Sequence, residues 1–461
     1  MGNRDHRTRL RPSTDTVKAM DREEETHLSA TAASAEKHPT GLYVLFATEM
    51  WERFSFYTML AMFTLYLRDQ SGQGFAWTAD QATGLYANYL MFVYASPLIG
   101  GWIADRGLGY RRAVMIGAVF FMVGHLLLSF SSMMAVYAAL TCLVIGNGFF
   151  KPNVSAMVGN LYPEGSHLKD RAYNIFYMGI NVGAFLAPVV AEFVRGRFGF
   201  HPAFAVAAGG MAISLFILWR FQKHVLSTDQ GASRAAAPVV PQAIDAVPDW
   251  KRIAALIVIY LIVIVFWMVF HQNGSTMTYW ANENTDWKVT GIISNAINPA
   301  WVVLLTFPLV ALWGWLDRRG REPSTPVKMA FGMFATSAAF FVLFLAARSG
   351  EANAGPGGIY DYKVSPFWLL GAYGVLTLGE LMLSPMGLAL VSKVAPRRFR
   401  GIMMGGWFVA TAIGNKLTQI GQLWDDMPHS QFWLMLSGAA VVMAFVLLVL
   451  LKPLKKAMPG A

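Results

Sequence analysis

Apolar runs of about twenty residues recur along almost the whole chain. Of its 461 residues, 55% are hydrophobic and only 14% are charged, whereas a soluble domain carries about a quarter charged residues. About twenty apolar residues are needed for a helix to cross a bilayer, because its backbone polar groups must be satisfied within the segment. The sequence therefore predicts an all-α membrane protein.

We predict twelve membrane-spanning helices with both termini in the cytoplasm. The expected ranges are 42–67, 81–104, 112–130, 133–158, 172–193, 202–221, 251–272, 290–316, 327–347, 366–392, 401–421 and 432–451. Most of the 37 Lys and Arg residues fall in the two tails and in alternate loops, which are therefore expected to be cytoplasmic. The net charge of +10 thus reflects orientation in a lipid bilayer and not an affinity for nucleic acid.

The predicted helices fall into two halves. Residues 41–221 and 251–452 are expected to form two six-helix bundles, joined by a cytoplasmic linker at 222–250 that is rich in Ala, Pro and Gln. Residues 1–40 are polar and are expected to form a disordered cytoplasmic tail, and 453–461 form a second tail. Two parallel halves around a central pathway are typical of the major facilitator fold.

A short repeat supports this division. Residues 100–106 end the second predicted helix, and the similar segment 314–320 ends the eighth. In the first copy, Asp105 and the following Arg111 and Arg112 can latch neighbouring helix ends in one conformational state. The alternative is a set of basic residues that anchors the loop on the cytoplasmic side.

The first predicted span contains three charged residues. Glu49, Glu52 and Arg53 share one helix face at spacings of three and four, and Lys151 lies deep in the fourth span, just before Pro152. A charge at this depth costs about 2.5–3.5 kcal/mol unless it has a partner or water, so such residues usually mark a transport pathway. The alternative is a static ion pair that holds the first and fourth helices together.

Several motifs resemble the proton-dependent oligopeptide transporter family. They lie in the order expected for that family over about 380 residues. The matching segments are 49–57, 148–155, 176–185, 298–299, 379–385 and 406–408.

The resemblance implies a proton-coupling group and a substrate site. Proton coupling is expected of Glu49, Glu52, Arg53 and Lys151, with Glu52 the preferred carboxylate, and the proton is the coupling ion in place of any cofactor. The expected substrate-binding residues are Tyr57, Tyr94, Lys151, Asn181, Asn298, Glu380 and Trp407. Glu380 is expected to bind the peptide ammonium with help from the two asparagines, since an ammonium needs one counter-charge and neutral acceptors. For each asparagine alone, the alternative is a hydrogen bond between helices.

The chain differs from the family pattern at two related places. Many members carry an arginine seven residues after the helix-one arginine, where this chain has Leu60, and acidic residues before a Gln-Gly pair in helix seven, where it has 271–274 with sequence HQNG. The absence of the cation agrees with the absence of the acid, because either alone would be an unpaired buried charge. Lys151 is then the expected main anchor for the substrate carboxylate.

Two other polar residues and the linker also bear on function. His271 is either a gate or proton site or a hydrogen-bonded histidine near the outer end of its helix. Lys416 is expected to extend toward the outer membrane interface, although it can also replace the missing arginine. Residues 222–250 are too polar for the two extra helices that bacterial members commonly have between the halves.

The resulting hypothesis is a monomeric, proton-coupled symporter in the bacterial inner (cytoplasmic) membrane that imports di- and tripeptides by alternating access. One alternative keeps the fold but carries another small metabolite, such as a modified peptide, nitrate or an amino-acid derivative. A second alternative is a peptide sensor that does not transport. An enzyme is not expected, because the sequence shows no nucleophile constellation, and the single Cys142 excludes a thiolate metal site.

Overall fold

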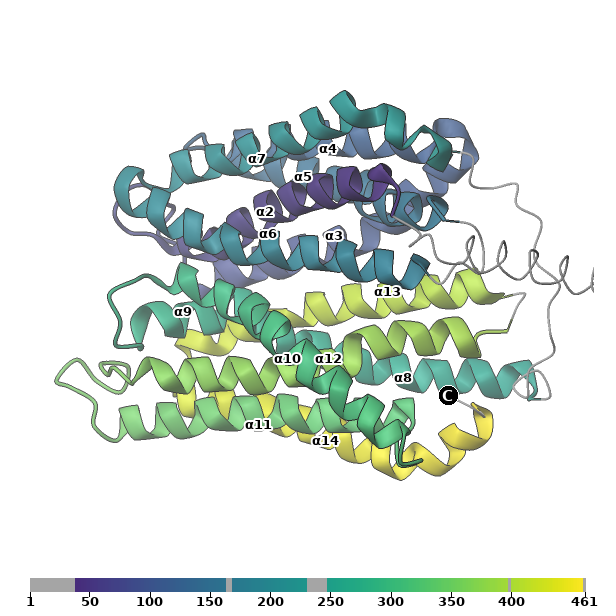
Figure 1. Cartoon of the computed structure of the whole chain (residues 1–461). Coiled ribbons are helices and arrows are strands. Elements are labelled where there is room, and N and C mark those ends of the chain that lie inside the picture. Colours follow the sequence, from purple (N-terminus) through teal and green to yellow (C-terminus); the bar gives the residue numbers. More distant parts are fainter. Residues whose placement is uncertain (1–37, 163–167, 230–246, 397–398, 459–461) are drawn as a thin grey trace, which may run out of the picture. The chain divides into compact units, whose positions relative to one another are not determined.

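The computed structural model describes residues 38–162, 168–229, 247–396 and 399–458, and most of these residues lie in helices. The long helices of the first half are α2 (Thr40–Arg68), α3 (Ala79–Ile103), α4 (Tyr110–Leu127), α5 (Met133–Asn160), α6 (Leu168–Phe198) and α7 (Phe200–Phe221). Those of the second half are α8 (Asp249–Phe270), α10 (Ser294–Asp317), α11 (Thr325–Glu351), α12 (Pro366–Val394), α13 (Arg400–Leu417) and α14 (His429–Ala457). The helices of each half lie together (Figure 1).

Each range predicted as a span coincides with one long helix, with ends that differ by a few residues. Within the described ranges, nine helical segments are long and apolar enough to cross a membrane. α2, α3 and α13 are not among these, and α2 carries the charged group at residues 49–53. The short helix α9 (Thr276–Glu283), which follows the 3₁₀ turn η5 (His271–Gly274), was not predicted.

Close helix contacts in the first half depend on glycine. A Cβ atom added to Gly100 of α3 would lie 1.9 Å from the carbonyl oxygen of Gly148 in α5. A Cβ atom added to Gly183 of α6 would lie 2.3 Å from the carbonyl oxygen of Met50 in α2. Neither distance is sterically possible, so glycine allows these helix backbones to approach, as small residues commonly do in membrane bundles.

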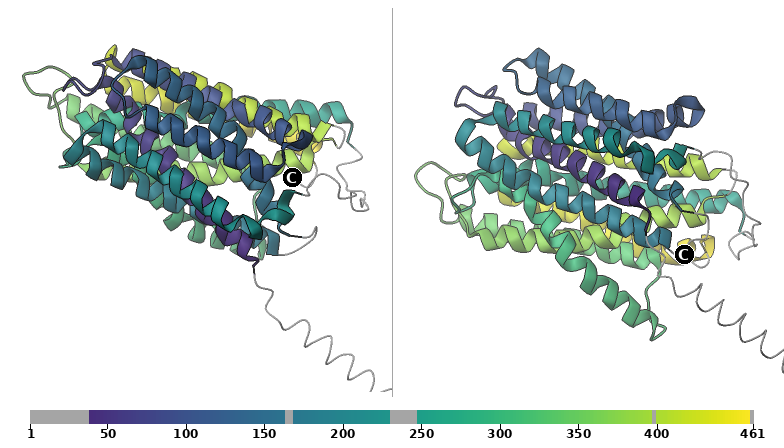
Figure 2. Two further views of the ribbon diagram at one scale, coloured as in Figure 1. Left: turned by 90° about the horizontal axis from the view of Figure 1, so that it is seen from above. Right: turned by 45° about the horizontal axis from the view of Figure 1, so that its top comes forward.

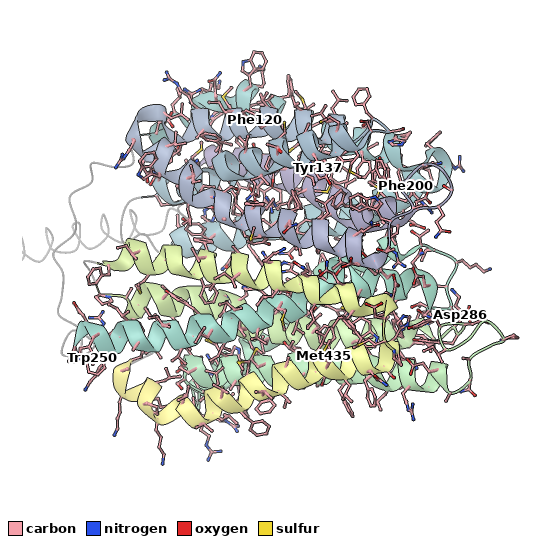
Figure 3. The ribbon with its side chains drawn as sticks, turned by 180° about the vertical axis from the view of Figure 1, so that it is seen from behind. Phe120, Tyr137, Phe200, Trp250, Asp286 and Met435 are labelled. Carbon is pink, nitrogen blue, oxygen red and sulfur yellow. The ribbon has the colours of Figure 1, made fainter. Side chains whose placement is uncertain are left out.

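The long helices run between two ends of the molecule (Figure 2). Phe200 and Asp286 lie at one end and Trp250 lies at the other (Figure 3). Arg68, the last residue of α2, lines the same cavity as Phe200. We call these the Arg68 end and the Trp250 end.

The loop after α3 contacts the start of α4 and the turns that follow α7. Asp105 accepts a hydrogen bond from the Tyr110 hydroxyl at 2.8 Å. Arg111 pairs with Asp229, through its backbone N–H at 2.8 Å and its Nε at 3.3 Å, and its Nη1 donates to Gln222 at 2.6 Å. The described start of the predicted linker, 222–229, therefore forms 3₁₀ turns that pack on this loop. The rest of that linker at 230–246, and tail residues 1–37 and 459–461, lie outside the described residues.

Candidate functional site

Three charged residues of α2 form a buried ion-pair group. Arg53 Nη2 donates to Glu52 Oε1 at 2.6 Å, and Arg53 Nε also contacts Glu52 Oε2. Arg53 Nε lies 3.4 Å from Glu49 Oε1, one helical turn earlier. All three residues are buried, and the guanidinium also lies over the Phe56 ring at 4.9 Å. Glu49 Oε2 has no hydrogen-bond partner among the described residues.

Lys151 lies opposite this group on α5. Its ammonium lies 4.7 Å from the centre of the Tyr94 ring on α3, and it forms no ion pair with any described residue. Glu49 and Glu52 are nevertheless within electrostatic range of it. Pro152 has no amide hydrogen, so the Gly148 carbonyl lacks its helical donor beside this ammonium. Lys151 therefore presents its positive charge to an aromatic face.

The second half contributes a carboxylate. Asn298 of α10 donates from Nδ2 to Glu380 Oε2 of α12 at 2.9 Å, and also to Thr377 Oγ1 at 2.9 Å. The Asn298 amide therefore fixes the orientation of Glu380. Within the described part of the chain, Glu380 forms no ion pair, so its charge is available to a ligand.

Tyrosines of the first half face this carboxylate. Tyr57 of α2, Tyr94 of α3 and Tyr177 of α6 all lie within electrostatic range of Glu380. Tyr177 is 45% exposed and was not predicted as a site residue. Tyr177 could have been predicted as a site residue because it lies four residues before Asn181, on the same helix face.

The structure does not bring Asn181 to Glu380 through a hydrogen bond. Asn181 Nδ2 instead donates at 2.9 Å to the carbonyl oxygen of Tyr177 in its own helix. Trp407 of α13 is buried and packs on Gly387 of α12, where an added Cβ would lie 2.1 Å from the indole ring. Neither residue makes a direct polar contact with the Asn298–Glu380 pair.

His271 is buried at the end of α8. Its ring stacks on Trp267 at 5.0 Å and lies edge-on to Tyr94 at 5.7 Å. The imidazole therefore shares the Tyr94 ring with the Lys151 ammonium, which places it beside the candidate site.

Leu60 and Gln272, which lie where the sequence differs from the family pattern, have different surroundings. Leu60 is buried in the apolar core. Gln272 donates to the Thr418 carbonyl at 3.0 Å and accepts from the Thr276 hydroxyl at 2.8 Å, so it fixes the turn between α8 and α9. The Lys416 ammonium donates to Asn88 Oδ1 of α3 at 2.6 Å, and its extension toward the outer membrane interface stays a prediction.

Lys416–Asn88 is one of several polar contacts that join the two halves. Arg68 lies 3.3 Å from Glu283 and 3.5 Å from Asp425, both in the second half. Further hydrogen bonds between the halves, such as those of Thr64 with Gly274, Ala79 with Asp425 and Thr290 with Glu192, also lie near the Arg68 end. A polar cavity of about 440 Å³ also lies there, away from Glu380. The polar contacts between the halves therefore close the Arg68 end.

The chain matches the POT family over residues 111–240 and 222–430. The dipeptide and tripeptide permease A of Klebsiella pneumoniae (strain 342) is 30% identical and covers 82% of this chain and 83% of its own length. The di-/tripeptide transporter of Lactococcus lactis subsp. cremoris is 29% identical, covering 94% of this chain and 99% of its own. A crystal structure of peptide transporter POT in complex with sulfate is similar with a TM-score of 0.82 and 27% identity, covering 93% of this chain and 97% of the other.

The bundle of long apolar helices and these similarities define a multi-pass membrane transporter. The chain belongs to the POT family.

Proposed function

We propose that this chain is a proton-coupled symporter that imports di- and tripeptides by alternating access. The distribution of charge between the halves is the strongest support for a peptide substrate. Lys151 on the first half and Glu380 on the second have opposite charges, and neither forms an ion pair with a described residue. A peptide zwitterion supplies one carboxylate and one ammonium, so it satisfies both charges and bridges the halves.

In this proposal, Lys151 binds the substrate carboxylate and Glu380 binds the ammonium. Asn298 orients Glu380, and Tyr57, Tyr94 and Tyr177 form the wall opposite it. The names of the two relatives support peptides as the substrate class. In this proposal, Asn181 supports the wall through its hydrogen bond to Tyr177 in α6, and Trp407 supports it by packing on Gly387 of α12.

Proton coupling is assigned to the group on α2 together with Lys151. Protonation of Glu52 or Glu49 removes a negative charge that attracts the Lys151 ammonium, and this favours binding of the substrate carboxylate by Lys151. The buried Oε2 atom of Glu49, which has no described hydrogen-bond partner, is a second place for that proton. His271, beside Tyr94, is a further candidate for the gate or the proton path.

The proposed topology has twelve membrane-spanning helices and both termini in the cytoplasm. α2, α3 and α13 then cross the membrane with their polar residues toward the pathway or the partner half, where the cost of their charges is reduced. The Arg68 end is outside, and the described conformation is closed to the outside. We place the protein in the bacterial inner membrane as a functional monomer.

The test is uptake of labelled dialanine into proteoliposomes, with and without an imposed inward proton gradient. Gradient-driven accumulation that is lost in Glu380→Gln and in Lys151→Gln supports the proposal. Glu351→Gln is a matched control, because this carboxylate ends α11, where it accepts from Ser430 at the start of α14. Absence of any uptake by folded protein contradicts the proposed peptide symport.

A second candidate function keeps the mechanism but changes the cargo to another small metabolite. It is favoured by Leu60, which places an apolar side chain where many family members have a cation. Competition of uptake by unlabelled dipeptides, single amino acids and nitrate separates the two. Inhibition by nitrate or a single amino acid but not by dipeptides favours the second candidate.

A further inference from the structure

Glu192 connects the two halves at the Arg68 end through the start of a helix. This residue of α6 accepts from the backbone N–H of Thr290 at 2.8 Å and from the Thr290 hydroxyl. Thr290 is the N-cap of the 3₁₀ turn η6 (Gly291–Ile293), which leads into α10, and its hydroxyl also accepts from the N–H of Ile292 at 3.4 Å. A carboxylate of the first half therefore satisfies the N-terminal donors of a helical segment in the second half.

Asp425 makes the reciprocal contact. This residue ends the 3₁₀ segment η8 (Thr418–Asp425) of the second half, and its Oδ2 accepts at 3.0 Å from the N–H of Ala79, the first residue of α3. Its Oδ1 lies 3.5 Å from Arg68 Nη2. A negative charge at a helix N-terminus is favourable because the unpaired N–H groups there carry partial positive charge. Each half thus places one carboxylate on a helix start of the other half.

The same chemistry also occurs inside one half. Glu351, at the end of α11, accepts from the backbone N–H of Ser430 at 2.8 Å and from the Ser430 hydroxyl at 2.5 Å, at the start of α14. The Glu351–Ser430 contact closely matches Glu192–Thr290 in its atoms. It differs in that both of its partners belong to the second half.

We propose that Glu192 and Asp425 are positioning residues that hold the Arg68 end closed by capping helices across the two halves. The inference rests on the proposed alternating access, in which these halves separate at the Arg68 end. Such separation must break both capping contacts, whereas the Glu351–Ser430 contact moves as a unit with its half. Loss of Glu192 or Asp425 therefore shifts the population toward the conformation that is open at the Arg68 end.

A cysteine between the halves reports this opening. Thr64 is fully buried, and its hydroxyl donates at 3.0 Å to the carbonyl oxygen of Gly274 in the other half. Thr64→Cys in a Cys142→Ser background gives a single thiol that a membrane-impermeant maleimide reaches only when the Arg68 end opens. We expect the initial labelling rate in vesicles to rise at least fivefold with Glu192→Ala and with Asp425→Ala. The rate is expected to stay within twofold of the parent with Glu351→Ala.

Two results overturn the inference. One is an unchanged labelling rate in Glu192→Ala, and the other is an equal rise in Glu351→Ala, which would indicate general loosening. If Glu192→Ala does not fold, Thr290→Val removes the hydroxyl while keeping the backbone N–H, and it is held to the same expectation. Labelling needs no substrate, so an absence of uptake with the expected labelling contradicts only the proposed cargo. Normal uptake with unchanged labelling contradicts only the role of Glu192.

Discussion

Glu380→Gln tests the assignment of the substrate ammonium most directly. The glutamine oxygen can still accept from Asn298, as Glu380 Oε2 does at 2.9 Å, so the change removes the charge and little else. Glu380 has no described ion-pair partner, so the lost interaction is the one with the ligand. A hydrogen bond to a charged group contributes about 1.5–3 kcal/mol, which corresponds to roughly 10- to 150-fold in affinity.

The assay compares dialanine with N-acetyl-dialanine, which has no ammonium. The unmodified protein is expected to prefer dialanine by roughly 10- to 150-fold in competition for binding, and Glu380→Gln is expected to remove most of that preference. The same substitution should leave the preference for dialanine over its carboxyl-terminal amide unchanged, because that preference depends on Lys151. Glu351→Gln serves as the control. A Glu380→Gln protein that still rejects N-acetyl-dialanine as strongly as the parent would refute the assignment.

The other predictions concern coupling and packing. Glu52→Gln should abolish proton-driven accumulation but keep exchange of labelled for unlabelled dipeptide, and full accumulation in this variant would contradict the role of the α2 group. Gly100→Ala should lower the melting temperature and yield, because the new methyl group would lie 1.9 Å from the Gly148 carbonyl oxygen, and overpacking of this kind costs about 1–3 kcal/mol. Gly438→Ala, with nothing within 4 Å of the new atom, is the control, and equal melting temperatures for the two variants would refute the packing argument.

The helix positions follow closely from the sequence, because a bilayer-length apolar run has few alternatives to a helix. The position of α9 does not follow from the sequence, because its eight residues include Thr, Asn and Glu and contain no long apolar run. Its placement depends on contacts outside itself, such as the hydrogen bond from the Thr276 hydroxyl to Gln272. A short polar segment fixed by tertiary contacts carries no periodic signal in the sequence.

The site residues divide in a similar way. The spacing of Glu49, Glu52 and Arg53 fixes their contact, because all three lie on one helix. The hydrogen bond of Asn298 with Glu380 joins two helices; the resemblance to a family predicted both residues as ligands of the substrate ammonium, and the residue type alone predicted a hydrogen bond between helices for Asn298. The contacts of Asn181 and Lys416 depend on tertiary structure. Asn181 donates to a carbonyl of its own helix and Lys416 donates to α3 of the other half, and neither contact follows from the residue types alone.

Gln272 and Leu60 affect substrate recognition because both side chains are uncharged. The amide of Gln272 is used within the turn after α8, and Leu60 packs in an apolar core, so neither position leaves an unsatisfied charge. Among the candidate site residues, Lys151 on the first half and Glu380 on the second each carry a charge without an ion-pair partner among the described residues. A substrate with one carboxylate and one ammonium matches that pair, whereas a second net charge on the substrate would enter a low-dielectric site without a counter-charge there. We therefore expect neutral dipeptides such as dialanine to compete better than those with an acidic or basic side chain, and equal competition by all three would refute this account.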